Sequence, residues 1–351
     1  MKLIDLSAPQ RELRVRLDPS PAYDFLASLY LLSSHDGSLE FEVSPRWVEK
    51  ARRALGQELR ADLARLLPPR GRTVGLIGVL DHTPGLSVKA FIKRVLATSA
   101  EALLELMLAE TLTDRQALPL LRSAIGGPEK AIEACLEATH ADIDRGPLRQ
   151  VLAQFPAETK ARLVRLLREG YTRIYAPEEP EVLPLLERDV AALARRAVVL
   201  TPGELVERAT GGFVIDPDVP LAGVVLAPTF FFRPYNLITA YNGIRVFVYP
   251  IETSTAEQAP PPELVRLYKA LGDVTRLKIL RLLAGREMYL QELAKALGVT
   301  HVTALHHMAM LRAAHLVQVV ERDSLKYYRL RADRAREATE LWREYVNAQE
   351  R

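Results

Sequence analysis

The chain has 351 residues, of which 48% are hydrophobic and 26% are charged, and its formal net charge is +3 at pH 7. This composition is that of a globular protein, and the length exceeds that of one typical domain. The small positive charge supports nucleic-acid binding only weakly, because a basic balance alone gives only salt-sensitive, sequence-independent affinity.

No apolar run approaches the roughly twenty residues that span a bilayer. The longest run, residues 221–232, is short and is interrupted by Pro228. The first seven residues lack the apolar segment of a secretory signal. We therefore expect a cytoplasmic protein with no membrane partner.

Helical periodicity dominates the first 200 residues. Residues 11–17 precede it and alternate polar with apolar side chains, which is the period of a half-buried strand. Ser, Asp, Pro or Gly stands at most boundaries between the periodic segments. The predicted helices cover residues 21–32, 45–67, 87–108, 114–124, 128–138, 146–155, 157–175 and 180–198.

The single cysteine, Cys135, excludes an intramolecular disulfide and agrees with a reducing compartment. It lies among small residues in one of the predicted helices, where we expect an ordinary buried side chain. A redox-sensing role is the alternative.

The sequence changes character after residue 200. A short capped helix is predicted at 201–209, and it is followed by β-type runs at 212–216, 221–227, 236–241 and 244–250. These runs predict one small sheet, which the strand at 11–17 can complete. We expect a mainly α protein with a small β component (α+β), divided into an N-terminal domain (1–252, with a possible subdivision near 200), a Pro-rich linker (253–262) and a C-terminal domain (263–351).

One aromatic segment follows the second of these β-type runs. It could line a ligand pocket with aromatic walls and one cation. Packing in the core and between domains is the alternative, and the sequence favours it. The residues are Phe230, Phe231, Phe232, Arg233 and Tyr235.

We find no motif for catalysis. The phosphate-binding Gly-x-x-x-x-Gly-Lys-Ser/Thr, the dinucleotide-binding Gly-x-Gly-x-x-Gly, His-Glu-x-x-His and Gly-x-Ser-x-Gly patterns are all missing from the sequence. We therefore expect that the protein is not an enzyme and requires no cofactor.

The C-terminal segment has the order of a helix-turn-helix. Asp273, which can cap free backbone N–H groups, precedes apolar residues at helical spacing over 277–283. A second amphipathic helix, 290–297, ends at Gly298, the residue type that most readily adopts the left-handed conformation of a tight turn. These features predict two helices joined by the turn of the motif.

The next segment predicts the helix that would enter a major groove. Its apolar residues Val302, Leu305, Met308 and Leu311 recur every three positions, and we expect them to face the core. The outer face would then be free for a groove. It would carry Thr300, His301, Thr303, Ala304, His306 and His307.

Two β-rich runs, 316–321 and 325–331, follow with a polar turn between them, which predicts a hairpin wing. This order of elements resembles the ArsR family of bacterial winged-helix repressors over residues 262–345. The resemblance rests on 271–283, which is similar to the family's Leu-x-Asp-x-x-Arg-x-x-Ile-Leu signature, and on 303–317, which is similar to its recognition helix.

The chain departs from the family pattern at two positions. Leu305 stands where a Ser is common, which changes the expected base contacts. His315 stands where the family has Gly before Leu316 and Val317, which predicts a different turn into the wing. The Cys pairs and the His–carboxylate sets that bind metals in this family are also missing, so the resemblance implies a non-metal member. A zinc cluster of His301, His306, His307 and His315 is the disfavoured alternative.

The resemblance implies a DNA-binding transcription regulator, expected to be a repressor, that binds a pseudo-palindromic operator in double-stranded DNA as a homodimer. Base and phosphate contacts are expected from the outer face of the recognition helix, with Arg276, Arg312, Arg322, Lys326 and Arg329 supplying charge. Dimer contacts, with packing inside the domain as the alternative, are expected from Leu264, Leu267, Tyr268, Leu341, Trp342 and Tyr345.

The N-terminal region resembles the helical region of unknown function that precedes ArsR-type winged helices in some bacterial regulators. The resemblance rests on residues 22–32, Trp47, 223–235 and 246–250. It implies a place in a regulator and no particular chemistry. As a separate hypothesis, we expect this region to sense a small non-metal effector. An enzyme or a protein-interaction platform, with the winged helix as a recruiting module, is the alternative.

Overall fold

The computed structural model describes residues 13–34, 39–67, 74–80, 83–140, 143–216, 218–219, 221–241, 243–252, 260–322 and 325–347. They form two compact units, each built from separate segments of the chain. The helical unit comprises residues 17–194 and 225–252. The winged unit comprises the described residues within 13–16, 195–224 and 260–347.

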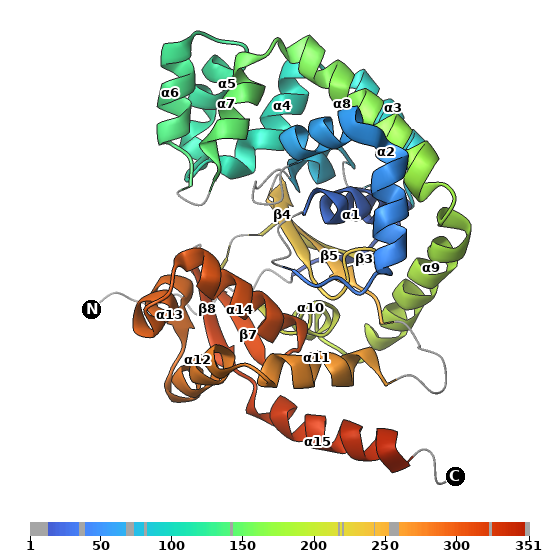
Figure 1. The fold of residues 1–351 in the computed structure, drawn as a ribbon, viewed down its shortest axis with the longest axis vertical. Helices are drawn as coiled ribbons and strands as arrows, with labels where there is room; N and C mark the ends of the chain where they lie inside the picture. Colours follow the sequence, from blue (N-terminus) through green and yellow to red (C-terminus); the bar gives the residue numbers. More distant parts are fainter. Residues whose placement is uncertain are drawn as a thin grey trace, which may run out of the picture. The chain divides into compact units, whose positions relative to one another are not determined.

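This division differs from the expected domains in one respect. Residues 195–224 were expected in the N-terminal domain, whereas they belong to the winged unit. Most of the expected linker, 253–259, lies outside the described residues. The mainly α fold with a small β component is confirmed, and Figure 1 shows both.

The helical unit surrounds a central helix with longer helices and a group of short ones. In Figure 1 α5, α6 and α7 form that group at one end, while α2, α8 and α9 curve past α1. The α-helices are α1 (Pro21–Ser33), α2 (Pro45–Leu66), α3 (Val88–Ala97), α4 (Ala100–Leu108), α5 (Leu118–Ala124), α6 (Glu129–Glu137), α7 (Arg145–Ala153), α8 (Pro156–Gly170) and α9 (Glu179–Arg196). Short 3₁₀ segments are η1 (Val74–Leu80), η2 (Ala109–Thr111) and η3 (Arg115–Ala117), and η4 (Tyr171–Tyr175) is a π-helical turn.

The helix predicted at 87–108 is two helices. Ser99 caps the second of them, because its side chain accepts a hydrogen bond from the backbone N–H of Ala102 at 3.2 Å. An apolar pattern that continues across a short break cannot reveal the change of direction at such a cap. Cys135 on α6 is buried, as expected, and burial raises the pKa of its thiol.

α1 is buried along its whole length, and its side chains are apolar or aromatic except for Asp24, Ser28 and Ser33. Both carboxylate oxygens of Asp24 accept hydrogen bonds. Oδ1 accepts from the hydroxyl of Thr229 at 2.6 Å and from the amides of Phe230 and Phe231 at 2.7 and 3.1 Å, and Oδ2 accepts from the hydroxyl of Tyr175 at 3.1 Å. Burial raises the pKa of this carboxyl, and these hydrogen bonds oppose the effect.

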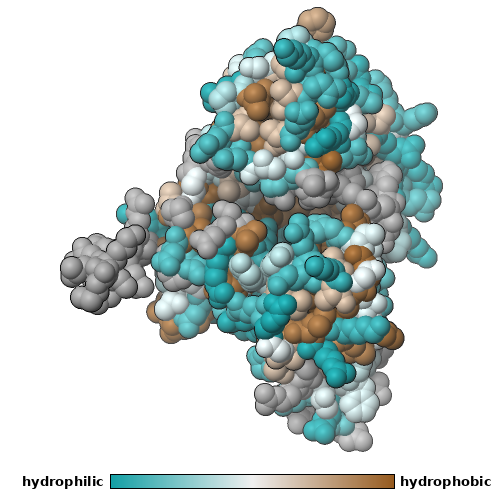
Figure 2. All heavy atoms as spheres, turned by 90° about the vertical axis from the view of Figure 1, so that its left-hand side faces the viewer, coloured by the Kyte–Doolittle hydropathy of each residue, from teal (hydrophilic) through white to brown (hydrophobic). Residues whose placement is uncertain are grey.

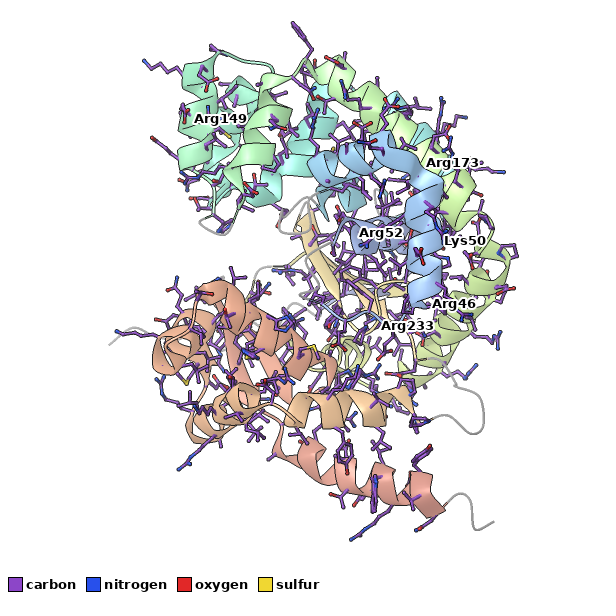
Figure 3. All side chains as sticks on the ribbon, in the orientation of Figure 1. Arg46, Lys50, Arg52, Arg149, Arg173 and Arg233 are labelled. Carbon is purple, nitrogen blue, oxygen red and sulfur yellow. The ribbon has the colours of Figure 1, made fainter. Side chains whose placement is uncertain are left out.

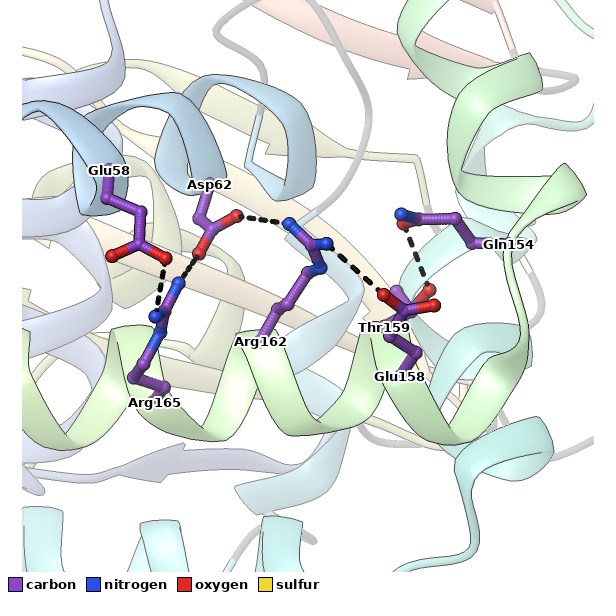
Figure 4. A network of polar contacts seen from close by, with 7 residues as sticks. All are labelled: Glu58, Asp62, Gln154, Glu158, Thr159, Arg162 and Arg165. Carbon is purple, nitrogen blue, oxygen red and sulfur yellow. Dashed lines mark hydrogen bonds and ion pairs between the residues drawn. The ribbon is translucent and has the colours of Figure 1, made fainter.

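Ion pairs join α2 to α8 at the edge of this unit. Asp62, which is buried, is 2.7 Å from Nη2 of Arg165 and 3.5 Å from Nη1 of Arg162 (Figure 4). Glu58 and Glu158 extend the same network at its two ends. A buried carboxylate with two cationic neighbours keeps the two helices in register.

The sheet of the helical unit has the order β1-β3-β5-β4. The strands are β1 (Val15–Leu17), β3 (Gly223–Thr229), β4 (Leu237–Tyr241) and β5 (Ile244–Pro250). β4 and β5 form an antiparallel hairpin in which Leu237 lies opposite Val248. The prediction that the N-terminal strand completes this sheet is confirmed.

The winged unit contains a second four-stranded sheet, of order β2-β7-β8-β6. Its strands are β2 (Phe213–Ile215), β6 (Met288–Tyr289), β7 (Val317–Arg322) and β8 (Leu325–Leu330). Its helices are α10 (Pro202–Thr210), α11 (Pro262–Leu271), α12 (Val274–Gly285), α13 (Leu290–Leu297), α14 (His301–Ala313) and α15 (Ala332–Asn347). The turn between β7 and β8 lies outside the described residues.

β2 corrects one expectation about the sheets. The run at 212–216 was expected to join the other β-type runs, but β2 lies parallel to β7, with Phe213 opposite Val319. A strand of three residues carries no pattern that identifies its partner. Its place is fixed instead by burial of Phe213 and by the turn at Gly211, where φ is 71° and α10 ends.

The face of the molecule drawn in Figure 2 is mainly hydrophilic and is interrupted by hydrophobic areas. Single exposed apolar side chains are ordinary on a folded protein. Within the described ranges, no helix has both the length and the apolar character that a bilayer crossing requires.

Candidate nucleic-acid interface

The helix-turn-helix forms as its local sequence predicts. The carboxylate of Asp273 caps α12 by accepting a hydrogen bond from the amide of Arg276 at 2.8 Å. Gly298 ends α13 in the left-handed conformation, with φ 66°. Thr300 then caps α14, because its hydroxyl accepts a hydrogen bond from the amide of Thr303 at 3.1 Å. α13 and α14 are therefore joined by a short turn with a cap on each side.

The face of α14 that meets the core differs from the predicted one. Ala304, expected on the outer face, is fully buried, while Val302 and Leu305 are 46% and 44% exposed. A spacing of three residues drifts around a helix of 3.6 residues per turn, whereas Ala304, Met308 and Leu311 at i, i+4 and i+7 stay on one face. The small side chain of Ala304 also lets α14 approach its neighbours closely.

The exposed face of α14 thus differs by two apolar residues from the one predicted. Thr300, His301 and Thr303 are exposed, as expected. Val302 and Leu305 join them, and the first half of the helix therefore offers hydroxyl, imidazole and apolar groups side by side. The prediction missed the two apolar residues because hydrophobic side chains in a helix were assigned to the core.

His306 and His307 are half-buried. The side chain of His307 is only 13% exposed, and its Nδ1 lies 3.7 Å from Oδ1 of Asp273 at the start of α12. Burial lowers the pKa of His307, and Asp273 opposes this shift. His307 is therefore uncharged near neutral pH and faces the cap of α12 more than solvent. Within the described ranges, no three His, Cys, Asp or Glu side chains gather in a metal-binding group.

Two arginines that were expected on the DNA-facing surface are used inside the domain. Nε and Nη2 of Arg276 donate hydrogen bonds to the backbone carbonyls of Ala270 and Lys269, at 2.8 and 2.7 Å, and so cap the end of α11. Arg312 is half-buried near the buried Tyr328, and desolvation lowers the pKa of its guanidinium. The sequence pattern could not separate these two roles from phosphate binding.

The arginines of the wing lie next to acidic side chains. Nη1 of Arg322 is 2.6 Å from Oε2 of Glu287, and its Nε is 3.4 Å from Oδ2 of Asp216, just after β2. Nη1 of Arg329 is 3.9 Å from Oε1 of the same Glu287. Lys326 is exposed on β8. The wing therefore carries its cations, but two of them are paired with carboxylates.

The polar contacts continue from β8 across β7 to α10. Arg329 donates through Nε to Oε1 of Gln318 on β7, and Gln318 donates through Nε2 to Oε1 of Glu207 on α10. The residues of α10 and β2 thus contact the wing through side chains as well as through the β2–β7 ladder. Sequence patterns did not predict this contact, because residues 195–224 were expected in the other domain.

The turn into the wing contains one non-glycine residue with positive φ. His315 adopts φ 57°, a left-handed conformation that is costly for a residue with a side chain. Its ring lies against Gly211, at the end of α10. The expected difference from the turn of the family stays a prediction.

The residues expected at a dimer contact fall into two sets. Leu264 and Leu267 are buried within the winged unit. They are core residues, in agreement with the alternative of packing inside the domain. Tyr268 and Trp342 are each 48% exposed, and Leu341 and Tyr345 are half-buried. Val265 and Val346, at 37% and 45% exposure, extend the apolar surface of α11 and α15.

The aromatic segment after β3 is core, not a ligand pocket. Phe231, Phe232 and Tyr235 are buried, and Phe231 stacks on Trp47 with ring centroids 4.5 Å apart. Arg233, labelled in Figure 3, donates from Nε to the carbonyl of Phe230 at 2.8 Å and from Nη2 to that of Glu42 at 3.2 Å. Its cation lies 4.1 Å from the ring centre of Phe230. These contacts favour the alternative of core packing for this segment.

A different hollow exists elsewhere in the helical unit. It has a volume of about 290 Å³ and lies between η1, α4 and β4. Its wall includes Ala102, Glu105, Leu106, Thr239 and Tyr241. This volume is near the lower end of the range for small-molecule sites.

Comparison with known proteins finds a family that matches the helix-turn-helix. Residues 273–319 match the model of the family described as bacterial regulatory protein, arsR family. The HTH-type transcriptional regulator KmtR of Mycobacterium tuberculosis is 35% identical over 74 residues, which are 21% of this chain and 57% of that protein. The chain therefore matches little more than half the length of this relative.

Two solved structures are also similar to part of the chain. HlyU from Vibrio cholerae is 28% identical, with a TM-score of 0.20, over 24% of this chain and 92% of that one. NolR from Sinorhizobium fredii is 24% identical, with a TM-score of 0.22, over 27% of this chain and 95% of that one. TM-scores this low do not support an assignment. The family assignment of the helix-turn-helix depends on the family match and on the capped helices described above. Residues 273–319 form a helix-turn-helix of the arsR family of bacterial regulatory proteins.

Proposed function

We propose that this protein is a transcription regulator that binds a specific DNA sequence through the first half of α14, and that it acts as a repressor. The observation that carries the proposal is the exposed face of α14, held in place by Ala304, Met308 and Leu311 beneath it. Hydroxyl and imidazole groups can form hydrogen bonds with base edges, and apolar side chains can contact the thymine methyl group. No enzymatic step is part of this proposal.

The proposal includes a homodimer. α11 and α15 pack together and expose Val265, Tyr268, Trp342 and Val346, an apolar surface that a second copy would cover. A two-fold dimer presents its recognition helices to two half-sites about one helical turn apart, so the operator would be a pseudo-palindrome. Aromatic residues such as Tyr268 and Trp342 are typical of the centre of such interfaces.

We also propose that the helical unit senses a small non-metal ligand. The hollow between η1, α4 and β4 supports this role better than the packed segment 230–235 does. A ligand can regulate the protein only if it binds the DNA-competent and incompetent forms with different affinity. A protein-interaction role for this unit, or an enzymatic one, would leave the DNA affinity independent of any ligand in this hollow.

Selection of bound sequences from random duplex DNA, repeated at two salt concentrations, tests the proposed function. We expect an inverted repeat with half-sites about one helical turn apart, together with a dimer by sedimentation of the protein alone. Recovery of no motif, with binding that disappears as salt rises, would show only phosphate contact and would contradict the proposal.

The pairing of the wing arginines predicts the effect of one substitution. In Glu287→Gln the carboxylate that holds Arg322 and Arg329 loses its charge. We expect operator affinity to rise severalfold at low salt, because the arginines gain freedom to pair with phosphate. The slope of log affinity against log salt should steepen by about one. Fluorescence anisotropy of labelled operator DNA across a salt series measures both.

Glu340→Gln is the matched control, because Glu340 is exposed on α15 and the substitution removes the same single charge. We expect it to change the slope much less. An equal change in both variants would mean that net charge controls the affinity, and the proposed competition between Glu287 and DNA would be wrong.

A further inference from the structure

The hollow between η1, α4 and β4 lies at an edge strand of the sheet in the helical unit. β4 is the last strand in the order β1-β3-β5-β4, so one side of it has no neighbour among the strands that the structure describes. Three consecutive residues of β4, Thr239, Ala240 and Tyr241, belong to the wall of the hollow. The main chain of an edge strand carries unpaired hydrogen-bonding groups. The hollow therefore lies where such groups are available to a ligand.

The register of β4 with β5 fixes which groups face the open side. Tyr241 lies opposite Ile244 across a two-residue turn, so this pair exchanges both of its main-chain hydrogen bonds. Along an antiparallel ladder, such pairs alternate with pairs that exchange no hydrogen bond. Ala240, opposite Arg245, belongs to the second kind. The N–H and C=O of Ala240 therefore both point away from β5.

Neither of these two groups has a partner in the described part of the chain. No hydrogen bond joins the N–H or the C=O of Ala240 to any described residue. Ala240 is half-buried, so its main chain is partly shielded from solvent. The N–H and C=O of one extended residue point in the same direction, one as a donor and the other as an acceptor. A flat molecule that offers an acceptor beside a donor matches this pair.

The rest of the wall leaves room for a flat ring. Apart from Ala240, four of its residues carry no side chain larger than a methyl group, namely Gly75, Gly78, Ala102 and Ala109. A Cβ atom on Gly78 would lie 3.1 Å from Cδ2 of Tyr241, so η1 packs closely against that aromatic ring. Leu106 and Leu118 add apolar surface. Small and apolar walls beside a few polar groups are typical of small-molecule sites.

The charges of the wall favour an uncharged ligand over an anion. The charged residues that line the hollow, Glu105 and Glu110, are both acidic. Nε and Nη2 of Arg122 donate to the two carboxylate oxygens of Glu105, at 2.8 and 2.7 Å, and these hydrogen bonds lower the pKa of Glu105. Glu105 is therefore ionised at neutral pH, and it already holds the guanidinium beside it. No Lys or Arg stands among the described residues of the wall, so an anion would find no cation there.

We propose that the hollow binds a small uncharged heterocycle whose edge carries an N–H donor beside an acceptor, as lactams and amino-azines do. The acceptor of the ligand would bind the N–H of Ala240, and its donor would bind the C=O of Ala240. The volume of about 290 Å³ admits a fused pair of rings but not a dinucleotide. The regulatory meaning of this site rests on the proposed function, whereas the binding itself does not.

Saturation-transfer NMR titration with the full-length protein tests the binding. The probes are 2-quinolone, a lactam, and 9-methyladenine, an amino-azine. We expect at least one of them to saturate the protein with a dissociation constant below about 2 mM. The analogues without the N–H, N-methyl-2-quinolone and 6-dimethylamino-9-methylpurine, should bind about tenfold more weakly or worse. No saturation by either probe up to about 5 mM, or equal binding of the matching analogue, would overturn the proposal.

The charge of the ligand is tested with a third compound. 2-Quinolone-4-carboxylate should bind more weakly than 2-quinolone, because the wall offers the carboxylate no cation. Tighter binding of the carboxylate would contradict the assignment of an uncharged ligand.

Two proline variants test the contact with Ala240. Ala240→Pro removes the N–H that would bind the ligand and leaves the β4–β5 hydrogen bonds in place, because proline is tolerated where the N–H of an edge strand points outward. Ile238, opposite Phe247, also faces the open side but is not part of the wall, so Ile238→Pro is the control. We expect about a tenfold loss of probe affinity or more in Ala240→Pro and normal binding in Ile238→Pro. Full affinity in a folded Ala240→Pro, or an equal loss in both variants, would overturn the proposal.

A variant outside the sheet keeps the test valid if proline disturbs the strand. Ala102 is exposed on α4 and lines the hollow, so Ala102→Leu should fill the hollow and abolish probe binding without lowering the melting temperature. Ala161→Leu, at an exposed position of α8 outside the wall, is the control and should bind the probe normally. Full binding by Ala102→Leu would place the probe elsewhere and refute this site.

Operator affinity with and without saturating probe separates this site from the sensing role. A probe that binds but leaves the operator affinity unchanged would support the site and refute the sensing role. Failure of the operator selection would leave the NMR titration unaffected, so the two proposals can fail separately.

Discussion

Leu305→Glu should reduce operator affinity by about 100-fold or more without unfolding the protein. Leu305 is 44% exposed on the proposed groove-facing side of α14, so the folded state accommodates a polar side chain there. In the groove, the new carboxylate would lose an apolar base contact and add repulsion from phosphates. Anisotropy with operator DNA measures the affinity, and circular dichroism on melting confirms the fold.

Two further variants sharpen this experiment. Phe155→Glu adds the same charge at a 79% exposed apolar position in the helical unit, and we expect it to leave the affinity nearly unchanged. Leu305→Ser should bind DNA but prefer different bases, because a hydroxyl replaces an apolar contact. Full operator affinity in Leu305→Glu would exclude α14 from the groove.

Asp24→Ala should lower the free energy of unfolding of the helical unit by about 3–5 kcal/mol. The substitution leaves four donors without an acceptor at a buried site, from Thr229, Phe230, Phe231 and Tyr175. Each unsatisfied buried donor costs about 1–3 kcal/mol, and partial rearrangement recovers some of this.

Urea titration monitored by tryptophan fluorescence measures this loss. The chain has two tryptophans, and Trp47 stacks on Phe231 in the helical unit. A Trp342→Phe background makes Trp47 the sole reporter. Asp24→Asn should cost less, because the amide oxygen of Asn still accepts from Thr229 and the two amides. A loss below about 1 kcal/mol in Asp24→Ala would show that water satisfies the donors, and this explanation of the burial of Asp24 would fail.

The helix-turn-helix was predictable because its signals are local. The cap at Asp273 and the left-handed Gly298 each act over a few neighbouring residues, and each forms as the sequence indicates. The phase of α14 was not predictable from the three-residue spacing, because Ala304 is small enough to be assigned to either face. Burial of Ala304 depends on how closely its neighbours approach, which is a property of the packed domain.

The roles of the arginines required the tertiary structure for a related reason. A guanidinium can bind a phosphate, a carboxylate or a backbone carbonyl, and the sequence does not distinguish these partners. Arg276 binds carbonyls at the end of α11, while Arg322 binds Glu287. Both residues were expected to supply charge to the DNA backbone. Only the positions of the acceptors separate them.

The parallel pairing of β2 with β7 has a consequence for biosynthesis. The two strands are separated by β3, β4, β5, β6 and four helices, so β2 leaves the ribosome long before its partner. During that interval the strands of the other sheet can pair, and Phe213 has no β7 to cover it. The winged unit is therefore the last part of the protein to complete its folding. A chain that is truncated before Val317 would display an unpaired strand and an uncovered aromatic ring. Such features promote aggregation and are bound by quality-control proteins.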